Sequence, residues 1–167
     1  ITMKSLPNVR FEFKLVGGSY RQEFTTDING EIDLSKLTPG AYEVRELEAP
    51  DGYLIDDAVR VVQVNPDENA NFVFTNTPKP SLRLIKTSSD GTRLGGVHFR
   101  IARIEDGTHY LDRITDDNGE INIPNLEPGV YSIKETATVA DHILDLQEYH
   151  VELFPGQTST ITIENQR

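Results

Sequence analysis

Apolar and polar residues alternate along most of the chain. Val9, Phe11 and Phe13 occupy alternate positions near the N-terminus, and the segment VHFRI at 97–101 repeats this spacing. A period of two places such side chains on one face of a β-strand. Asn-Gly and Pro-Gly pairs separate the alternating runs, and these pairs favour the tight turns that join short strands. The pattern therefore predicts an all-β fold in which short strands form a sandwich.

The pattern occurs twice in the chain. TDINGEI at 26–32 matches TDDNGEI at 115–121, and LTPGAYEV at 37–44 matches LEPGVYSI at 126–133. Both pairs of segments are offset by 89 residues. Repetition of whole strand-and-turn segments at a fixed offset indicates that one domain is present in two copies.

Proline residues separate the two copies. The sequence TPKP at 77–80 disfavours both a helix and a central strand, and it is typical of a short, stiff linker. We therefore predict two tandem immunoglobulin-like β-sandwich domains, residues 1–78 and 79–167. Domains of roughly 80 residues bury small cores. The chain has no cysteine, so a covalent cross-link that stabilised such a core would need other chemistry.

Acidic residues outnumber basic ones. The 27 Asp and Glu residues against 16 Lys and Arg residues give a net charge of −11, which opposes binding to nucleic acid or to an anionic membrane. No apolar run approaches the roughly 18 residues that a membrane span needs, and the N-terminal residues lack the basic and apolar regions of a signal peptide. If the protein is exported, its signal and its anchor are expected outside this segment.

Three polar residues fall on the apolar side of the alternation in the second copy. Lys86 continues the spacing of two leucines in LRLIK, Glu135 continues that of Tyr and Ile in YSIKE, and Asn165 ends the strand ITIEN. The first copy repeats two of them, at Glu46 and at Asn76, which ends FVFTN. Each residue alone could stand at a strand end that opens to solvent. Because Lys and Glu are almost never fully buried without a partner, the coincidence favours a functional cluster in the core.

The combined motifs resemble those of a known domain family. YEVRELEAPDGY at 42–53, the inward lysine of LRLIKT, the Asp-Asn-Gly turn and the terminal FTN and IEN are similar to Cna B-type, or SpaA-like, prealbumin-like domains of Gram-positive surface adhesins and pilins. The resemblance covers nearly the whole chain, twice. The second copy departs from the family pattern after Glu135, where TATVADHI replaces Ala-Pro-x-Gly-Tyr. The resemblance implies an intramolecular isopeptide bond between Lys86 and Asn165, assisted by a buried Glu135.

The chemistry of these residue types agrees with that implication. A lysine amine is nucleophilic only when neutral, and burial can lower a lysine pKa by up to about 3–5 units. A carboxamide is a poor electrophile, so a protonated carboxyl beside it would polarise the carbonyl and pass a proton to the departing ammonia. The bond would form once per molecule, so we expect self-processing rather than enzyme activity, and no cofactor or metal. A closed loop of 79 residues would contribute on the order of 4 kcal/mol.

The first copy is expected to lack the amine. Aligning Leu6 with Leu94 places the equivalent of Lys86 upstream of Ile1, so the first domain is expected to lack most of its first strand. In this alignment Lys4 matches a residue of the turn region. Glu46 and Asn76 are therefore expected to lie side by side without a bond, with the carboxyl protonated and hydrogen-bonded.

Other candidate sites carry weaker signals. His98, His109, His142 and His150 lack metal-ligand spacing and are expected on the surface, and the DDNG sequence at 116–119 favours a turn over a calcium loop. We predict a structural stalk or pilin-like module on the cell wall of a Gram-positive bacterium. Its expected partners are neighbouring domains of the same surface protein. An adhesin domain that itself binds a host extracellular protein or a glycan is the alternative. An accessory carbohydrate module is disfavoured, because Trp is absent and there are 6 Tyr.

Overall fold

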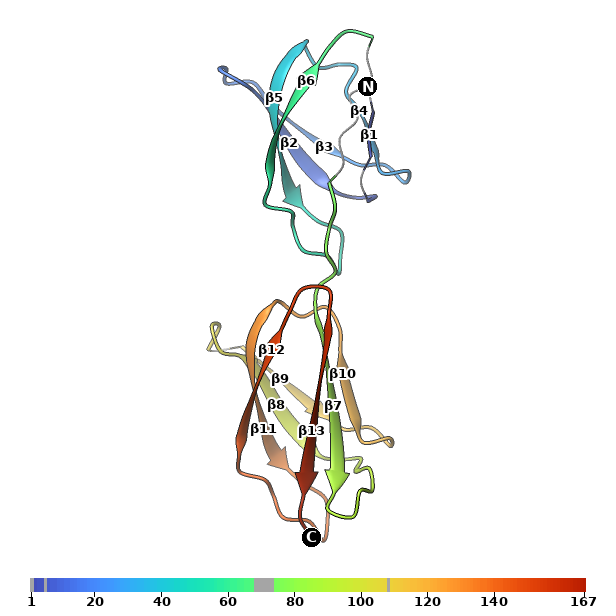
Figure 1. Cartoon of the computed structure of the whole chain (residues 1–167), viewed down its shortest axis with the longest axis vertical. Helices are drawn as coiled ribbons and strands as arrows, with labels where there is room; N and C mark the ends of the chain where they lie inside the picture. The colour runs from blue at the N-terminus through green and yellow to red at the C-terminus, as the bar shows by residue number, and fades with distance from the viewer. Residues whose placement is uncertain (1, 5, 68–73, 108) are drawn as a thin grey trace. The chain divides into compact units, whose positions relative to one another are not determined.

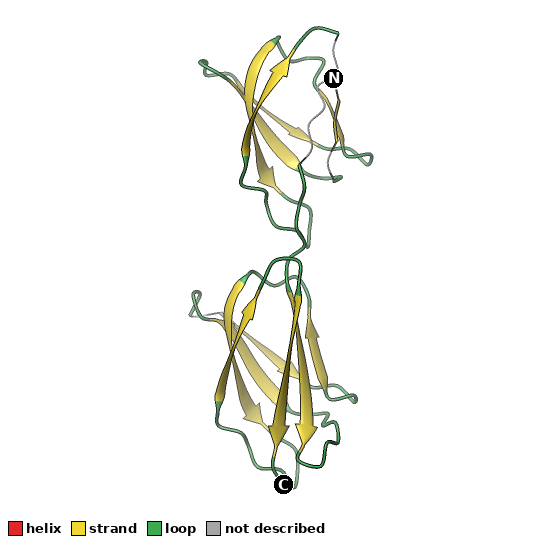
Figure 2. Ribbon diagram, viewed as in Figure 1, coloured by secondary structure: helices red, strands yellow, loops and turns green. Residues whose placement is uncertain are grey.

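The computed structural model describes residues 2–4, 6–67, 74–107 and 109–167, which form two compact units, Ile1–Thr77 and Pro78–Arg167. Every regular element in these described ranges is a β-strand, so the predicted all-β sandwich class is confirmed (Figures 1 and 2). Within the same ranges, no helix has the length and apolarity that crossing a bilayer requires. The units divide one residue before the sequence-based boundary.

Two sheets form the second domain. Its described residues contain strands β7 (Ser81–Ser88), β8 (His98–Arg103), β9 (Tyr110–Ile114), β10 (Glu120–Ile123), β11 (Gly129–Ala137), β12 (Glu148–Leu153) and β13 (Thr158–Asn165). One sheet has the order β10-β7-β13 and the other the order β12-β11-β8-β9. Strands β7 and β13, the first and the last of the domain, run parallel, with Lys86 opposite Ile163 and Asn165 opposite Ser88. The apolar faces of both sheets enclose one core.

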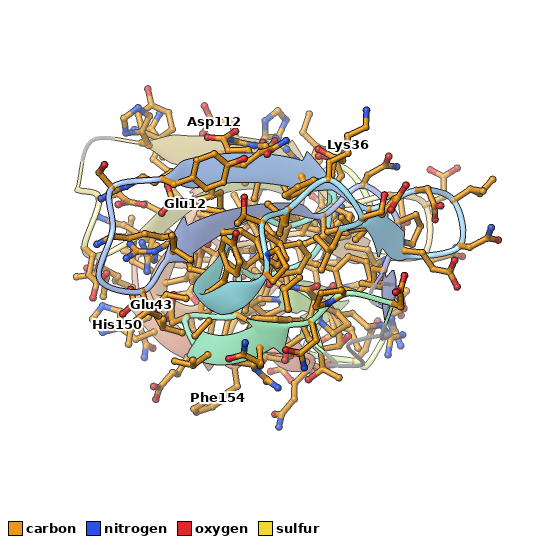
Figure 3. The ribbon with its side chains drawn as sticks, turned by 90° about the horizontal axis from the view of Figure 1, so that it is seen from above. Glu12, Lys36, Glu43, Asp112, His150 and Phe154 are labelled. Atoms are coloured by element: carbon orange, nitrogen blue, oxygen red, sulfur yellow. The ribbon has the colours of Figure 1, made fainter. Side chains whose placement is uncertain are left out.

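The first domain repeats this arrangement in its described residues. They form β1 (Thr2–Lys4), β2 (Arg10–Leu15), β3 (Arg21–Thr25), β4 (Glu31–Asp33), β5 (Gly40–Glu48) and β6 (Val59–Val64). One sheet has the order β3-β2-β5-β6, and β1 pairs with β4. The strand expected at FVFTN, 72–76, lies partly outside the described residues. Buried apolar side chains form the core of this domain. The charged side chain of Lys36 is exposed and projects outward (Figure 3).

The position of Lys4 differs from the sequence-based alignment. Lys4 pairs with Glu31 in strand β1, and the counterpart of Glu31 in the second domain, Glu120, pairs with Ile85. Lys4 therefore corresponds to Ile85 and not to a residue of the turn. Corresponding positions of the two domains are 81 residues apart at Lys4 but 88 residues apart at Val9. The counterpart of Val9 in the second domain is identified by its matching backbone hydrogen bonds.

The physical reason is a difference in loop length. The connection between the first two strands is seven residues shorter in the first domain than in the second, as the change of offset from 81 to 88 requires. A constant offset, carried backwards from Leu6, placed most of the first strand upstream of Ile1. The described strand β1 has three residues where β7 has eight.

A glycine in the turn before β10 holds the strand that carries Lys86. The backbone φ of Gly119 is +70°, and a Cβ there would lie 2.8 Å from the Lys86 carbonyl oxygen and 2.9 Å from the Leu94 amide nitrogen. The Gly119 carbonyl also accepts a hydrogen bond of 2.7 Å from the Lys86 amide. Gly119 therefore allows two backbone segments to approach more closely than any other residue would.

We expect Gly119→Ala to lower the free energy of unfolding of the second domain by about 3 kcal/mol, because the substitution adds a backbone clash to left-handed strain. Gly91 is the matched control, since its φ is +85° and a Cβ there would meet nothing within 4 Å. Gly91→Ala should cost about 1 kcal/mol. Urea denaturation of both variants measures the difference. Equal losses would show that the close approach at Gly119 has no energetic consequence.

Candidate functional site

Three strands bring the predicted polar residues of the second domain together. Lys86 lies on β7, the central strand of its sheet, and Asn165 ends the neighbouring strand β13. Glu135 lies on β11, in the facing sheet. The side chains of Lys86, Asn165 and Glu135 all point into the core, because each follows buried apolar residues with a period of two. Lys86 is 0% exposed, Asn165 1% and Glu135 7%.

The three side chains form a continuous chain of contacts. The Lys86 Nζ atom lies 2.6 Å from Oδ1 of Asn165 and 3.0 Å from the carbonyl oxygen of Ile163. Nδ2 of Asn165 donates a hydrogen bond of 2.6 Å to Oε1 of Glu135. The other carboxyl oxygen, Oε2, lies 3.7 Å from Nζ. Glu135 thus contacts both the amine and the amide nitrogen of the carboxamide.

Burial sets the electrostatics of this cluster. Burial lowers the pKa of the Lys86 amine below its usual range, and the nearby Glu135 carboxylate opposes this shift only in part. Oε2 of Glu135 is buried and has no hydrogen-bond partner within the described part of the chain. A neutral amine can attack a carbonyl carbon, and the carboxyl group is placed to move protons between the two nitrogens. The arrangement is therefore suited to acyl transfer from Asn165 to Lys86.

The loop after β11 contributes two residues that the sequence analysis did not identify. Thr138 accepts a hydrogen bond of 2.9 Å from Nδ2 of Asn165 through Oγ1. His142 is partly buried, and its Nε2 lies 2.9 Å from Oγ of Ser88, which is fully buried beside the cluster. This histidine was expected among the surface histidines and is only partly exposed, whereas His98, His109 and His150 are exposed. The departure of TATVADHI from the family pattern was the available signal.

The described residues of the first domain contain the counterparts of two of the three groups. Nδ2 of Asn76 donates hydrogen bonds of 2.5 Å to Oε1 of Glu46 and of 2.9 Å to the carbonyl oxygen of Leu54. The amide of Asp56 donates a bond of 3.2 Å to the other carboxyl oxygen of Glu46. Burial raises the pKa of the Glu46 carboxyl above its usual range, and the negative charges of Asp56 and Asp57 add to this effect. Oδ1 of Asn76, the atom that corresponds to the acceptor of the Lys86 amine, is buried and has no hydrogen-bond partner in the described ranges.

Several solved structures share this fold. The shaft pilin SpaA of Lactobacillus rhamnosus GG has a TM-score of 0.57 and 14% sequence identity, over 99% of this chain and 96% of that one. The Bacillus anthracis TIE protein has a TM-score of 0.51 and 23% identity, over 99% of this chain and 33% of that one. At these identities the likeness concerns the fold.

Proteins of known sequence and a family model also match the chain. Colossin-A of Dictyostelium discoideum is 27% identical over 151 residues, which are 78% of this chain and 1% of that protein. The BOS complex subunit NOMO1 of Homo sapiens is 26% identical over 139 residues, which are 81% of this chain and 11% of that protein. The chain thus spans only a small part of the relatives it matches. The model of the SpaA prealbumin-like fold domain matches residues 2–78 and again residues 80–167. With both units matched over almost their full length, the chain belongs to the SpaA family as two tandem prealbumin-like domains.

Proposed function

We propose that this chain is a load-bearing module of a Gram-positive cell-surface protein, and that an isopeptide bond between Lys86 and Asn165 joins the first and last strands of its second domain. The observation that carries this proposal is the buried contact of 2.6 Å between Nζ and Oδ1, with the Glu135 carboxyl against both partners. Membership of a family that includes shaft pilins supports a structural role on the cell surface.

The bond forms by acyl transfer without a cofactor. The neutral Nζ of Lys86 attacks Cγ of Asn165, and the bond between Cγ and Nδ2 breaks. Glu135 accepts a proton from the attacking amine and delivers a proton to Nδ2, which leaves as ammonia. The carboxyl ends in its original state, but the carboxamide is consumed, so the reaction happens once per molecule. The module is therefore a self-cross-linking structural protein and not an enzyme.

The cross-link acts between the strands at which the domain is pulled. Strand β7 follows directly on the linker, β13 is the last strand of the domain, and the two lie side by side (Figure 1). Tension that enters through Pro80 and leaves through Gln166 passes along β7 to Lys86, across the new bond and out through Asn165. The sandwich enclosed between these two residues then carries little of the force. Neighbouring domains of the same surface protein are the partners through which this force is transmitted.

Intact mass spectrometry of the folded chain tests the proposal. We expect the wild-type protein to weigh one ammonia less than its sequence, and Glu135→Gln to restore the full mass, because glutamine cannot transfer the protons. Glu46→Gln, the same substitution at the corresponding residue of the first domain, is the matched control and should keep the loss. Peptide mapping should find Lys86 and Asn165 in one branched peptide. A folded wild-type chain with the unmodified mass rejects the proposed bond.

A further inference from the structure

The loop after β11 places one hydroxyl against the nitrogen that the proposed reaction releases. Nδ2 of Asn165 carries two protons. It donates one of them to Oε1 of Glu135 at 2.6 Å and the other to Oγ1 of Thr138 at 2.9 Å. Oδ1 of the same carboxamide faces Nζ of Lys86 at 2.6 Å. Both protons of the leaving nitrogen therefore have an acceptor, and Thr138 supplies the one that is not a carboxyl group.

The first domain places a different oxygen at the same point. Nδ2 of Asn76 also donates to a carboxyl oxygen, that of Glu46, and to one neutral oxygen, the carbonyl of Leu54 at 2.9 Å. Three residues after its glutamate, where the second domain has Thr138, the first domain has Ala49, which lacks a hydroxyl. In both domains the carboxamide nitrogen thus lies between a carboxyl group and a neutral acceptor, although the neutral acceptor comes from a different residue.

The loop that carries Thr138 is fastened beside the reaction centre at its other end. Nε2 of His142 lies 2.9 Å from Oγ of the buried Ser88, on strand β7. The amide of Ile143 donates a hydrogen bond of 2.8 Å to the carbonyl oxygen of Gln166, directly after β13. The loop is therefore tied to the strand of the amine and to the strand of the carboxamide. A hydroxyl held in this way is in place before the reaction begins.

The hydrogen bond to Thr138 becomes stronger as the nitrogen leaves. In the starting carboxamide, Nδ2 is a neutral donor. After Nζ of Lys86 has attacked Cγ and Glu135 has delivered a proton, the N–H groups on this nitrogen resemble those of an ammonium ion. Hydrogen bonds from a charged donor are roughly twice as strong as neutral ones. An interaction that is stronger in the transition state than in the ground state raises the rate of the chemical step.

We propose that Thr138 is a further catalytic residue of the cross-linking reaction, where it holds and stabilises the departing nitrogen of Asn165. The inference rests on the proposed isopeptide bond and adds to it a residue that touches a reacting atom. As Nζ of Lys86 bonds to Cγ, Glu135 moves the amine proton to Nδ2, the bond between Cγ and Nδ2 breaks, and ammonia leaves. Thr138 accepts a hydrogen bond from this nitrogen throughout and neither gains nor loses a proton.

The rate of ammonia loss in a single turnover tests this role. The unreacted full chain is kept unfolded in urea and diluted into buffer, acid stops the reaction, and intact mass gives the cross-linked fraction at each time. Tyrosine fluorescence follows folding in parallel, since the chain has 6 Tyr and no Trp. We expect Thr138→Val to fold like the wild type but to cross-link about 10-fold more slowly, because one hydrogen bond is lost. Thr138→Ser, which keeps the hydroxyl, should react at nearly the wild-type rate.

Thr136→Val is the matched control, because Thr136 is exposed two residues earlier, and it should leave the rate unchanged. A Thr138→Val chain that reacts as fast as the wild type overturns the inference, since a hydroxyl that bound the starting amide and the transition state equally would not change the rate. Equal slowing by Thr138→Val and Thr138→Ser also overturns it, because the hydroxyl is then not the cause.

Thr138→Ala, which introduces the residue of the first copy, gives the same comparison if the valine variant does not fold. The wild-type chain distinguishes the two proposals. A folded wild-type chain that keeps its full mass rejects the isopeptide bond itself, whereas a wild-type chain that loses ammonia together with an equally fast Thr138→Val rejects only the role of Thr138.

Discussion

Stretched between its termini, the second domain of the wild-type chain should release almost no length, whereas Glu135→Gln should release about 270 Å. The difference arises because the proposed bond spans 79 residues between Lys86 and Asn165, and extended chain reaches about 3.4 Å per residue. With the bond in place, only the few residues outside this loop can extend. Without it, force separates β7 from β13 and the whole sandwich unravels.

Single-molecule force spectroscopy of the full chain measures this length. The first domain is the internal reference, because its unfolding should appear in both the wild-type and the Glu135→Gln records. Lys86→Arg, which keeps the positive charge but removes the reactive amine, should behave like Glu135→Gln. A second domain that extends fully in the wild-type chain would contradict the load path through Lys86 and Asn165.

Glu135→Ala should destabilise the second domain more than any other single change at the site. It prevents the cross-link, which contributes on the order of 4 kcal/mol through its closed loop. It also removes the carboxylate partner of the buried Lys86 amine, a loss of about 3–5 kcal/mol. Small domains have total stabilities of about 5–15 kcal/mol, so the variant should be close to unfolding.

The double variant Lys86→Met/Glu135→Gln separates the two contributions. It lacks the cross-link but buries no charge, so its loss should be near 4 kcal/mol alone. Hydrogen exchange read by mass spectrometry in urea reports each domain separately, and the first domain should be unchanged. Equal stability of Glu135→Ala and the double variant would show that the uncompensated charge costs nothing.

The two variants should also differ in their dependence on pH. Burial lowers the pKa of Lys86 in the folded state, so the unfolded state of Glu135→Ala binds more protons than the folded state does. Its stability should therefore increase as the pH rises toward the ordinary lysine pKa of about 10.5. The double variant has no amine at position 86, so this contribution should be absent from its pH profile.

The sequence by itself determined the class of fold, the duplication and the inward direction of the polar residues. These features are local. Strand periodicity decides which face a side chain occupies, so Lys86, Glu135 and Asn165 could each be assigned to the core from their immediate neighbours. The same reasoning found Glu46 and Asn76 in the first copy, because the repeat preserves the period on β5 and at the end of FVFTN.

The family resemblance implied that Lys86, Glu135 and Asn165 meet, but only the tertiary structure showed this contact and decided which positions of the two domains correspond. Contact between Lys86 and Asn165 depends on parallel pairing of β7 with β13, which joins residues 79 positions apart and leaves no local trace in the sequence. The position of Lys4 in the fold depends on the pairing of its strand with β4. A constant offset between the two copies does not reveal that the loop after the first strand differs in length by seven residues. His142 likewise reaches Ser88 through a loop without periodicity. Periodicity fixes the direction of a side chain, whereas distance between residues remote in sequence is fixed by strand pairing and loop length.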